Sequence, residues 1–374
     1  MLKIRINQIK ALLLVNLFSL ITIFMKKKVW VISERGTDAR DNGYYFYRYL
    51  KKNHPEIKVY YIIDKKSSDY EKVKEDAVQY GSLKNYWVVT IAQKLISSHY
   101  ALILPSLFGK VWKLLPLRKK FYFLQHGVIY NDLVSLHREK APMKLFICGA
   151  KPEYEYIKKN FGHEEGVVQY TGLARYDNLH NIQTKKQILI MTAWRGFIRS
   201  KEGFLKSKYY QQFQSLLKNK ELNSILETNG YELIFYPHYE FQKYLDCFNV
   251  SENCIKLASF QEYDVQTLLK ESKLLITDFS SVFFDFAYMK KPVIFFHFDA
   301  NEFFERHYEK GYFNYEQDGF GCVCLTTEDV IEALKKHLLN DCLLEDIYKQ
   351  RIEAFFSLHD ENNCQRIYEK IIEK

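Results

Sequence analysis

The chain has 374 residues, a length that suggests two domains rather than one small module. Apolar residues make up 47% and charged residues 26%, so the composition excludes a disordered, collagen-like or multi-span membrane protein. The formal net charge of +9 favours anionic partners such as nucleic acid, lipid headgroups or phosphorylated substrates. Seven scattered cysteines without paired CxxC motifs predict reduced thiols, and Cys322-Val-Cys324 is interpreted as part of a strand.

A nearly apolar run at residues 11–25 stands between basic residues near the N-terminus. It ends in Lys26, Lys27 and Lys28 instead of a small-residue cleavage site, so it does not match a secretory signal. At about 1.5 Å per helical residue it reaches roughly 22 Å, short of the ~30 Å hydrocarbon core of a bilayer. A polar stripe recurs at every third position: Asn16, Ser19 and Thr22. We therefore expect residues 1–27 to form an amphipathic helix on an anionic membrane surface, with a buried core helix as the alternative.

The rest of the chain alternates short β-branched and aromatic runs with helical stretches. The first series predicts strands at residues 28–33, 58–63, 95–97, 121–124 and 144–148, with helices at 43–52 and 69–80. The second series predicts strands at 187–191, 231–236, 254–256, 274–277 and 292–296. Apolar strands that alternate with helices are typical of parallel sheets covered on both faces.

A polar stretch at residues 178–186 separates the two series and is the best candidate for a linker. We therefore predict an α/β protein with two doubly wound, Rossmann-like domains, 28–180 and 181–374. They are expected to face a central cleft at the carboxyl ends of their strands. The charged helical C-terminus, from Leu343 onward, is expected to pack back across the first domain.

Side chains suited to phosphate or proton chemistry follow several predicted strands. His126 follows the strand at 121–124, and His238 follows the strand at 231–236. Histidine has the pKa best suited to take a proton from an alcohol near neutral pH. Arg195 follows the strand at 187–191, where a guanidinium can grip phosphate oxygens in a bidentate fork. Each histidine taken alone is equally consistent with a hydrogen-bonded structural residue.

The segment Thr277-Asp278-Phe279-Ser280-Ser281 joins an apolar strand to a helical pattern. Backbone N–H groups and the dipole at such a helix start favour a bound anion. The alternative is an ordinary N-cap, for which Asp and Ser are preferred residues.

Several common ligand motifs are absent from the sequence. It contains no Asp-x-Asp, P-loop, GxGxxG or HExxH pattern, so we expect no metal site and no cofactor. Charge neutralisation is then expected from arginine, histidine and backbone donors. Nucleic-acid binding is the least favoured partner class, because the basic residues form no stripe or known module.

Five motifs follow one another along the chain: Gln125-His126-Gly127, Thr171-Gly172-Leu173-Ala174-Arg175-Tyr176-Asp177, Thr192-Ala193-Trp194-Arg195, Tyr236-Pro237-His238, and Ile276-Thr277-Asp278-Phe279-Ser280-Ser281 followed by Asp285 and Lys291-Pro292. In kind and order they resemble the motifs of the CDP-glycerol glycerophosphotransferase family of teichoic acid and capsule synthesis, and the resemblance runs from about Phe121 to the C-terminus. A looser match to the closing motif of the family lies at 360–367. The chain has Val128-Ile129 where the family usually has Thr-Pro, and Leu173-Ala174 where a Tyr-Pro-like pair is common. These departures leave the acceptor and the alditol of the donor open.

The resemblance implies a GT-B-like fold, with an acceptor domain first and a CDP-glycerol-binding domain second. It implies that His126 is the catalytic base and that His238 is a second catalytic histidine. The substrate-binding residues that it implies are Gln125, Gly127, Arg175, Arg195, Thr277, Asp278, Ser280, Ser281 and Asp285. A weaker likeness to capsule-type members at residues 33–43 implies acceptor binding by Glu34, Arg35, Asp38, Asp41 and Asn42.

The implied activity is transfer of glycerol phosphate from CDP-glycerol to a hydroxyl of a lipid-linked or growing cell-surface polysaccharide, with release of CMP. The resemblance also implies a peripheral location on the cytoplasmic face of the bacterial membrane. One rival hypothesis is a metal-independent GT-B glycosyltransferase that uses a nucleotide sugar. The other is a non-catalytic, membrane-bound glycan-binding protein. The sequence does not distinguish single addition from polymerisation, and it does not indicate the oligomeric state.

Overall fold

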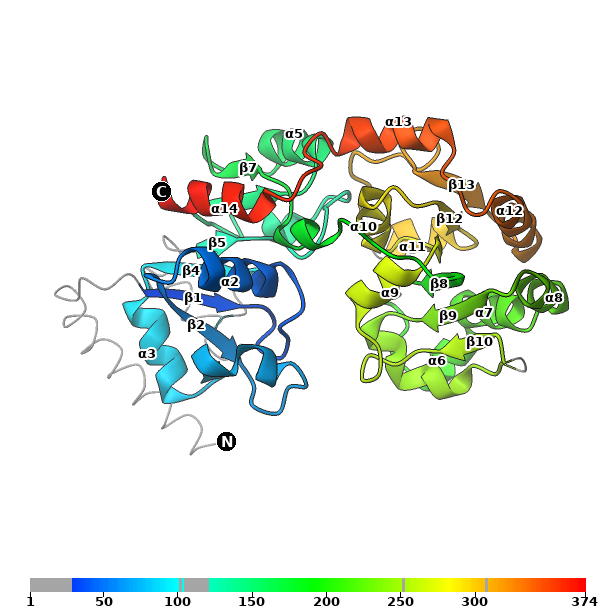
Figure 1. Cartoon of the computed structure of the whole chain (residues 1–374), viewed down its shortest axis with the longest axis horizontal. Helices are drawn as coiled ribbons and strands as arrows, with labels where there is room; N and C mark the ends of the chain where they lie inside the picture. Colours follow the sequence, from blue (N-terminus) through cyan, green and yellow to red (C-terminus); the bar gives the residue numbers. More distant parts are fainter. Residues whose placement is uncertain (1–28, 101–102, 104–120, 251–252, 307–308) are drawn as a thin grey trace. The chain divides into compact units, whose positions relative to one another are not determined.

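A computed structural model describes residues 29–100, 103, 121–250, 253–306 and 309–374 of the chain (Figure 1). The helix predicted at residues 1–27 lies outside these residues. The chain divides into two compact units. The first unit comprises the described residues up to His126, residues 134–178 and residues 360–374, and the second comprises residues 127–133 and 179–359. None of the helices in the described part of the chain is long and apolar enough to cross a membrane.

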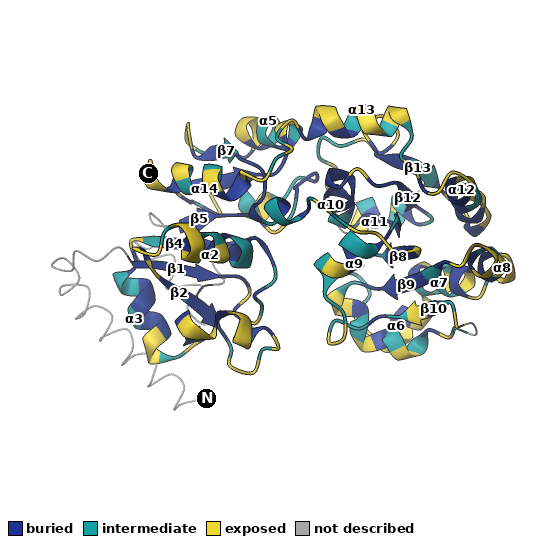
Figure 2. Cartoon of the chain, in the orientation of Figure 1, coloured by how far each residue is buried: buried dark blue, intermediate teal, exposed yellow. Residues whose placement is uncertain are grey.

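The first unit is built on a seven-stranded parallel sheet of order β3-β2-β1-β4-β5-β6-β7. Its strands are β1 (Val29–Ser33), β2 (Lys58–Ile63), β3 (Ala77–Gln79), β4 (Lys94–Ser97), β5 (Phe121–Phe123), β6 (Leu145–Cys148) and β7 (Val168–Tyr170). Its helices are α2 (Asn42–Asn53), α3 (Leu83–Ile91), α5 (Lys151–Asn160) and α14 (Asn363–Ile372), with short 3-10 helices η1 (Tyr70–Asp76), η4 (Val134–Leu136) and η5 (Ala174–Asn178). All five residues of β1 are buried, as expected for a strand covered on both faces (Figure 2).

The second unit is built on a six-stranded parallel sheet of order β10-β9-β8-β11-β12-β13. Its strands are β8 (Gln187–Met191), β9 (Glu232–Tyr236), β10 (Ile255–Leu257), β11 (Leu274–Thr277), β12 (Val293–Phe296) and β13 (Gly321–Cys324). Its helices are α6 (Lys201–Lys206), α7 (Lys208–Leu217), α8 (Lys220–Asn229), η6 (Tyr239–Cys247), α9 (Val265–Glu271), α10 (Val282–Tyr288), α11 (Ala300–Arg306), α12 (Thr327–Leu339) and α13 (Asp346–Phe355). The interpretation of Cys322 and Cys324 as strand residues is confirmed by β13.

One predicted helix is confirmed only in its first part, and there as a 3-10 helix. The segment 69–80 forms η1 and then β3, which pairs with β2. Asp76 ends the helical part, where it accepts hydrogen bonds from Lys51 and Lys58 at 2.7 and 2.9 Å. Val78 is then buried in the sheet. A three-residue strand is too short for its alternation to outweigh the helical pattern before it.

The segment 127–133 departs from the predicted division at residue 180, because it belongs to the second unit. Tyr130 explains this placement. Its ring packs against Phe283, Phe284 and Phe313, with centroids 5.6–6.0 Å away. Its hydroxyl also donates a hydrogen bond to the carbonyl of Phe279 at 2.5 Å. Burial of this aromatic side chain in the second core therefore outweighs continuity with β5.

The final helix α14 returns to the first unit, whereas residues 343–359, which include α13 and were also expected to pack on the first domain, belong to the second unit. The carboxylate of Asp177 accepts hydrogen bonds from the backbone N–H groups of Asn363 and Cys364, both at 2.8 Å. It also accepts one from the side chain of Asn363 at 2.7 Å. Gly172 has a φ of +78°, and a Cβ there would lie 1.8 Å from Asn363 Oδ1. The segment 171–177 and the closing motif at 360–367 therefore pack closely together and hold α14 on the first unit.

Replacing Asp177 with alanine should loosen α14, because three donors lose their acceptor at the start of the helix. We expect the free energy of unfolding to fall by about 2–4 kcal/mol. Urea unfolding measures this loss, and hydrogen exchange should show it concentrated in residues 363–372. Glu373→Ala, which removes only an exposed pair with Lys370, is the matched control. Equal stability of the two variants would contradict the role of Asp177 in anchoring α14.

Candidate functional site

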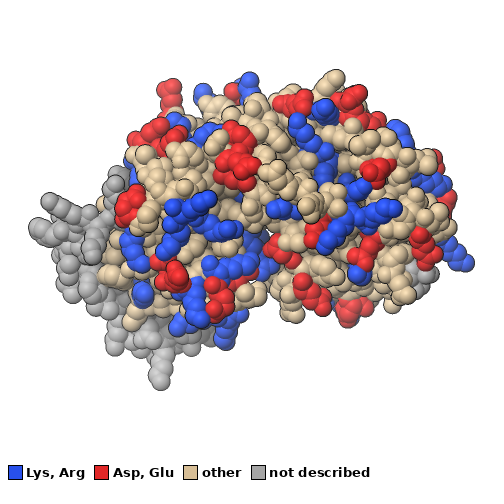
Figure 3. All heavy atoms as spheres, in the orientation of Figure 1, with Lys and Arg blue, Asp and Glu red and all other residues tan. Residues whose placement is uncertain are grey.

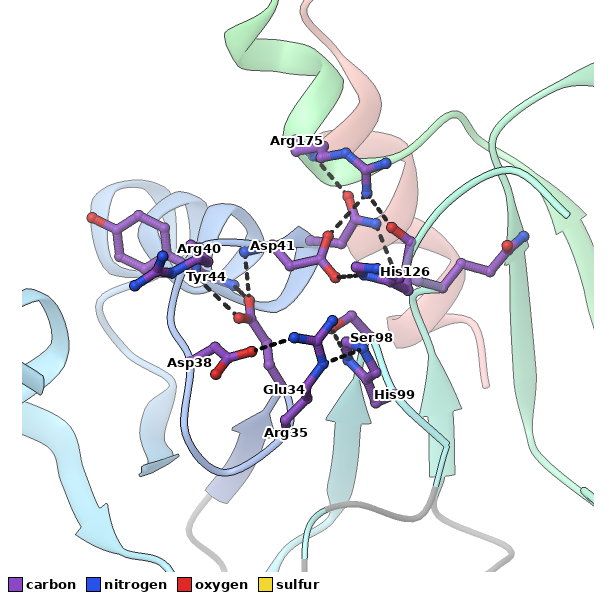
Figure 4. Close-up of polar contacts among 12 residues, drawn as sticks. Glu34, Arg35, Asp38, Arg40, Asp41, Tyr44, Ser98, His99, His126 and Arg175 are labelled. Atoms are coloured by element: carbon purple, nitrogen blue, oxygen red, sulfur yellow. Dashed lines mark hydrogen bonds and ion pairs between the residues drawn. The ribbon is translucent and has the colours of Figure 1, made fainter. Parts of the chain in front are cut away.

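The order of strands in the first sheet reverses between β1 and β4. Ligand sites of doubly wound sheets lie at such a switch point, outside the carboxyl ends of the strands. Here the loop after β1 carries Glu34 to Asp41, the loop after β4 carries Ser98 and His99, and the segment after β5 carries His126. Figure 4 shows these side chains converging, together with Arg175 from η5.

The imidazole of His126 is held by a charged network. Its Nδ1 lies 2.6 Å from Asp41 Oδ2, and the other oxygen, Asp41 Oδ1, lies 2.9 Å from Arg175 Nη1. Arg175 Nη1 also donates to the carbonyl of His126 at 2.5 Å. The side chain of His126 is 57% exposed, whereas those of Asp41 and Arg175 are 11% and 12% exposed. The network is therefore buried beneath a histidine that faces solvent.

The partner of Nδ1 determines the tautomer of His126. A carboxylate can only accept a hydrogen bond, so Nδ1 of His126 carries the proton in this pair. In the neutral ring, Nε2 is then the basic nitrogen. Burial opposes ionisation of Asp41, but the charge and hydrogen bond of His126 and the charge of Arg175 outweigh it and hold the pKa of Asp41 well below its usual range. Asp41 therefore remains a carboxylate at neutral pH and keeps His126 oriented as a proton acceptor.

Glu34 shapes the loop that carries Asp41. Its buried carboxyl group accepts hydrogen bonds from the backbone N–H groups of Arg40, Asp41 and Tyr44 at 2.8–3.0 Å. Burial and the nearby charge of Asp41 raise the pKa of Glu34 to about 8. Glu34 is fully buried in this structure, and acceptor binding by this residue stays a prediction. Its role in this structure is to close the loop and place Asp41 beside His126.

Two further predicted site residues lie beneath the site. Asn42 is fully buried, donating to the carbonyl of Gln125 at 2.8 Å and accepting from the N–H of Arg175 at 3.0 Å. Gln125 is also fully buried, and its Nε2 donates to Ile147 O and Glu153 Oε1. Its φ of +62° turns the chain after β5, which directs His126 outward. Burial and internal hydrogen bonds give Gln125 and Asn42 a structural role here, and contact of either side chain with substrate stays a prediction.

His99 was not identified from the sequence. Its ring lies 4.7 Å from that of His126, its Nε2 accepts from Arg35 Nε at 3.2 Å, and its Nδ1 lies 3.0 Å from Ser98 Oγ. Arg35 also pairs with Asp38 at 3.1 Å. Burial, reinforced by the adjacent His126, lowers the pKa of His99 well below its ordinary value. The signal was present, because Ser98-His99 directly follows a strand of the first series, as His126 does.

Arg195 occupies the corresponding switch point of the second sheet, between β8 and β11. Its side chain is fully buried and binds both oxygens of Asp299, through Nε at 2.8 Å and Nη2 at 2.9 Å. Its Nη1 lies 2.9 Å from Asp278 Oδ2 and donates to the carbonyl of Ala193 at 3.0 Å. The donors of Arg195 already bind two carboxylates and a carbonyl, so its role in this structure is internal, and a direct grip on phosphate stays a prediction. Arg195 holds together the segments that follow β8, β11 and β12.

Asp278 and Thr277 are also part of this support. Asp278 is fully buried, and its Oδ1 accepts from the N–H of Ala193 at 2.7 Å. Thr277 is buried too, and its hydroxyl donates to the carbonyl of Met191 at 2.5 Å. Both side chains therefore have internal partners, and their contact with substrate stays a prediction.

The hydrogen bond that sets the tautomer of His238 differs from that of His126. Its Nδ1 accepts a hydrogen bond from the N–H of Glu240 at 3.2 Å, at the start of η6, and its ring stacks on Trp194 with centroids 6.0 Å apart. Since Nδ1 accepts, the proton of the neutral ring is on Nε2. His126 therefore offers a proton acceptor at Nε2, whereas His238 offers a donor there.

The remaining predicted contacts stay predictions. Ser280 and Ser281 are half-buried before α10, and Ser281 is the N-cap residue without a side-chain capping bond. This does not match the alternative of an ordinary side-chain N-cap. Asp285 is buried within α10, and Gly127 is half-buried directly after His126. Lys291 is buried and donates to the carbonyls of Lys270 and Ser272 at 3.2 and 2.7 Å, so it supports the end of α9.

Replacing Arg195 with methionine should destabilise the second unit. The change leaves Asp278 and Asp299 buried without their cation, and we expect a loss of about 3–5 kcal/mol in the free energy of unfolding. Chemical denaturation followed by tryptophan fluorescence measures this loss. Arg306→Met, which removes a half-exposed arginine paired with Glu302, is the control. A loss no larger than that of the control would show that Arg195 does not stabilise the second unit through Asp278 and Asp299.

Comparison with known proteins places these features in a family. The model of a family described as CDP-Glycerol:Poly(glycerophosphate) glycerophosphotransferase matches residues 14–373. The minor teichoic acid biosynthesis protein GgaB of Bacillus subtilis (strain 168) is 31% identical, over 97% of this chain and 42% of that protein. The teichoic acid poly(glycerol phosphate) polymerase of the same strain is 25% identical, over 86% of this chain and 45% of that protein. The chain therefore spans less than half the length of these two relatives.

Solved structures agree on the fold. The wall teichoic acid polymerase TagF matches all of this chain with a TM-score of 0.69 at 20% identity, covering 98% of that structure. A complex of S. aureus MnaA with UDP matches 94% of this chain and 98% of that structure, with a TM-score of 0.57 at 13% identity. The predicted GT-B-like pair of Rossmann-like domains is confirmed. The family model matches residues 14–373, and GgaB is 31% identical over 97% of this chain. The chain therefore belongs to the CDP-glycerol:poly(glycerophosphate) glycerophosphotransferase family.

Proposed function

We propose that the chain transfers glycerol phosphate from CDP-glycerol to a hydroxyl group of a growing cell-surface polymer and releases CMP. The observation that carries this proposal is the Asp41–His126–Arg175 network. It holds an exposed imidazole with its basic Nε2 available at the switch point of the first sheet. A transfer to an alcohol needs such a proton acceptor, and family membership supplies the donor class.

In the proposed reaction, the acceptor oxygen attacks the phosphorus that bears glycerol. As the new O–P bond forms, His126 Nε2 takes the hydroxyl proton, while the proton on Nδ1 stays on the ring and remains hydrogen-bonded to the carboxylate of Asp41. The bond from this phosphorus to the bridging oxygen breaks, and CMP leaves with that oxygen. Asp41 stabilises the imidazolium that forms, while Arg175 keeps the carboxylate in place.

On the donor side, we propose that His238 donates a hydrogen bond from Nε2 to a phosphate oxygen of CDP-glycerol. The hydrogen bond from Glu240 N–H to Nδ1 supports this, because it leaves the proton on Nε2. Ser280 and Ser281 are proposed to bind the diphosphate, with the segment they occupy supported by Arg195 and Asp278. Hydrogen-bond donors can then stabilise the developing phosphoryl charge without a metal ion.

The acceptor is proposed to be a lipid-linked or growing polymer of the teichoic acid or capsule type, on the cytoplasmic face of the membrane. Teichoic acid proteins among the relatives support the polymer class. Peripheral attachment through residues 1–27 rests on the sequence pattern alone. Lys and Arg side chains are mixed with Asp and Glu over the face drawn in Figure 3, which does not favour a nucleic-acid track.

Incubation with CDP-glycerol and, separately, with sugar nucleotides tests the donor and the base together. We expect CMP release from CDP-glycerol with a suitable acceptor, and a roughly 10²–10⁴-fold lower turnover in His126→Ala. His163→Ala removes a half-buried histidine outside the site and is the control. Turnover of a sugar nucleotide instead would favour the glycosyltransferase hypothesis. Near wild-type turnover in His126→Ala would remove His126 from the mechanism.

The Asp41→Asn variant tests the tautomer. An asparagine can still accept from Arg175, but its NH₂ group would donate to Nδ1 of His126 and move the proton to Nε2. We expect kcat to fall about 10²–10⁴-fold with little change in KM for the donor. Asp76→Asn is the matched control, since Asp76 is also a buried carboxylate and binds Lys51 and Lys58. Equal effects of both substitutions on kcat would contradict the role of Asp41.

A further inference from the structure

Three metal-ligating side chains converge beside the proposed base. One ligand atom from each of Asp41, His99 and His126 lies within 4.8 Å of the other two. They come from three loops, after β1, β4 and β5, so no sequence motif joins them. The proposed transfer assigns roles to His126 and Asp41 but none to His99. Two imidazoles and one carboxylate are a donor set typical of zinc sites.

The outward bonds of Asp41 and His99 match those of oriented metal ligands. Arg175 occupies Asp41 Oδ1 and leaves Oδ2 on the side of His126. Because Arg35 donates to His99 Nε2, the Nδ1 proton of the neutral ring points to Ser98 Oγ, 3.0 Å away. Metal-bound histidines commonly donate their second nitrogen in this way. His99 Nε2, Asp41 Oδ2 and His126 Nδ1 are then the atoms that would meet a cation.

Arg35 must move away before a cation can bind His99, because Arg35 Nε donates to His99 Nε2 at 3.2 Å. Its side chain is 42% exposed and already paired with Asp38 at 3.1 Å. It can therefore leave His99 and keep a carboxylate partner. Ligand atoms about 2.0–2.2 Å from a tetrahedral ion lie about 3.4 Å apart, so the 2.6 Å contact between Asp41 and His126 must open slightly.

We propose that Asp41, His99 and His126 form an inhibitory site for Zn²⁺, with water as the fourth ligand. Coordination through Nδ1 replaces the hydrogen bond from His126 to Asp41. The proton of the neutral ring then resides on Nε2, which no longer accepts one from a substrate hydroxyl. The inhibition rests on the proposed function, whereas the binding does not.

The test uses ZnCl₂ with the full chain and a competing chromophoric chelator. The key variant is His99→Phe, which keeps a ring beside His126 but removes both nitrogens. We expect wild type to bind one Zn²⁺ at least tenfold more tightly than His99→Phe does. His54→Phe is the control, because His54 also lies near a carboxylate, 3.5 Å from Glu56, and stacks on Tyr368. It should bind Zn²⁺ like wild type, and thermal melting should show all three proteins folded.

A second measurement separates this proposal from the proposed function. CMP release, relative to the zinc-free rate of each protein, should fall in wild type at zinc concentrations at least tenfold lower than in His99→Phe. Equal zinc affinity in wild type and His99→Phe would overturn the site, whatever the activity. Tight binding that depends on His99 without any loss of CMP release would overturn the inhibition. Absence of turnover in zinc-free wild type would count against the proposed function and leave the binding result to decide the site.

Discussion

The carboxylate of Asp41 is the interaction on which the proposed chemistry depends. One oxygen holds Nδ1 of His126 and the other holds Arg175, so a single buried charge orients both groups. The carboxylate can serve both because burial is offset by the hydrogen bond from His126 and the charge of Arg175, which keep it ionised. Without that charge, the exposed ring of His126 would have no fixed tautomer, and its basic nitrogen would not be directed toward solvent.

The rest of the first unit supports this arrangement. Glu34 folds the loop after β1 around three backbone N–H groups, and the left-handed backbone of Gln125 turns the chain after β5. Arg175 lies in η5, and the same short helix contains Asp177, which anchors α14. The C-terminal helix is therefore linked to the site through two residues of one turn. This explains why segments almost 190 residues apart in the sequence act as one structural element.

The sequence predicted both sheets because their strands are apolar on both faces and long enough to stand out, such as 187–191. It missed β3 and β7, three-residue strands that each include a glutamine, whereas β5, of the same length, was predicted because all three of its residues are aromatic. His126 and His238 were found because each follows a strand. The opposite protonation of their Nε2 atoms was not predictable, since it depends on Asp41 and on the N–H of Glu240. Arg195 and Gln125 were assigned to substrate because nothing in a motif reveals burial, whereas the structure shows both engaged internally.

The central claim is that His126 presents a proton acceptor at Nε2, whereas His238 presents a proton donor at Nε2. Long-range ¹H–¹⁵N NMR of the wild-type chain measures this most directly, with His126→Ala and His238→Ala used to assign the signals. At a pH where both rings are neutral, the account predicts a proton on Nδ1 of His126 and on Nε2 of His238. A proton on Nε2 of His126 would contradict it, because that nitrogen could not accept a proton from the attacking hydroxyl.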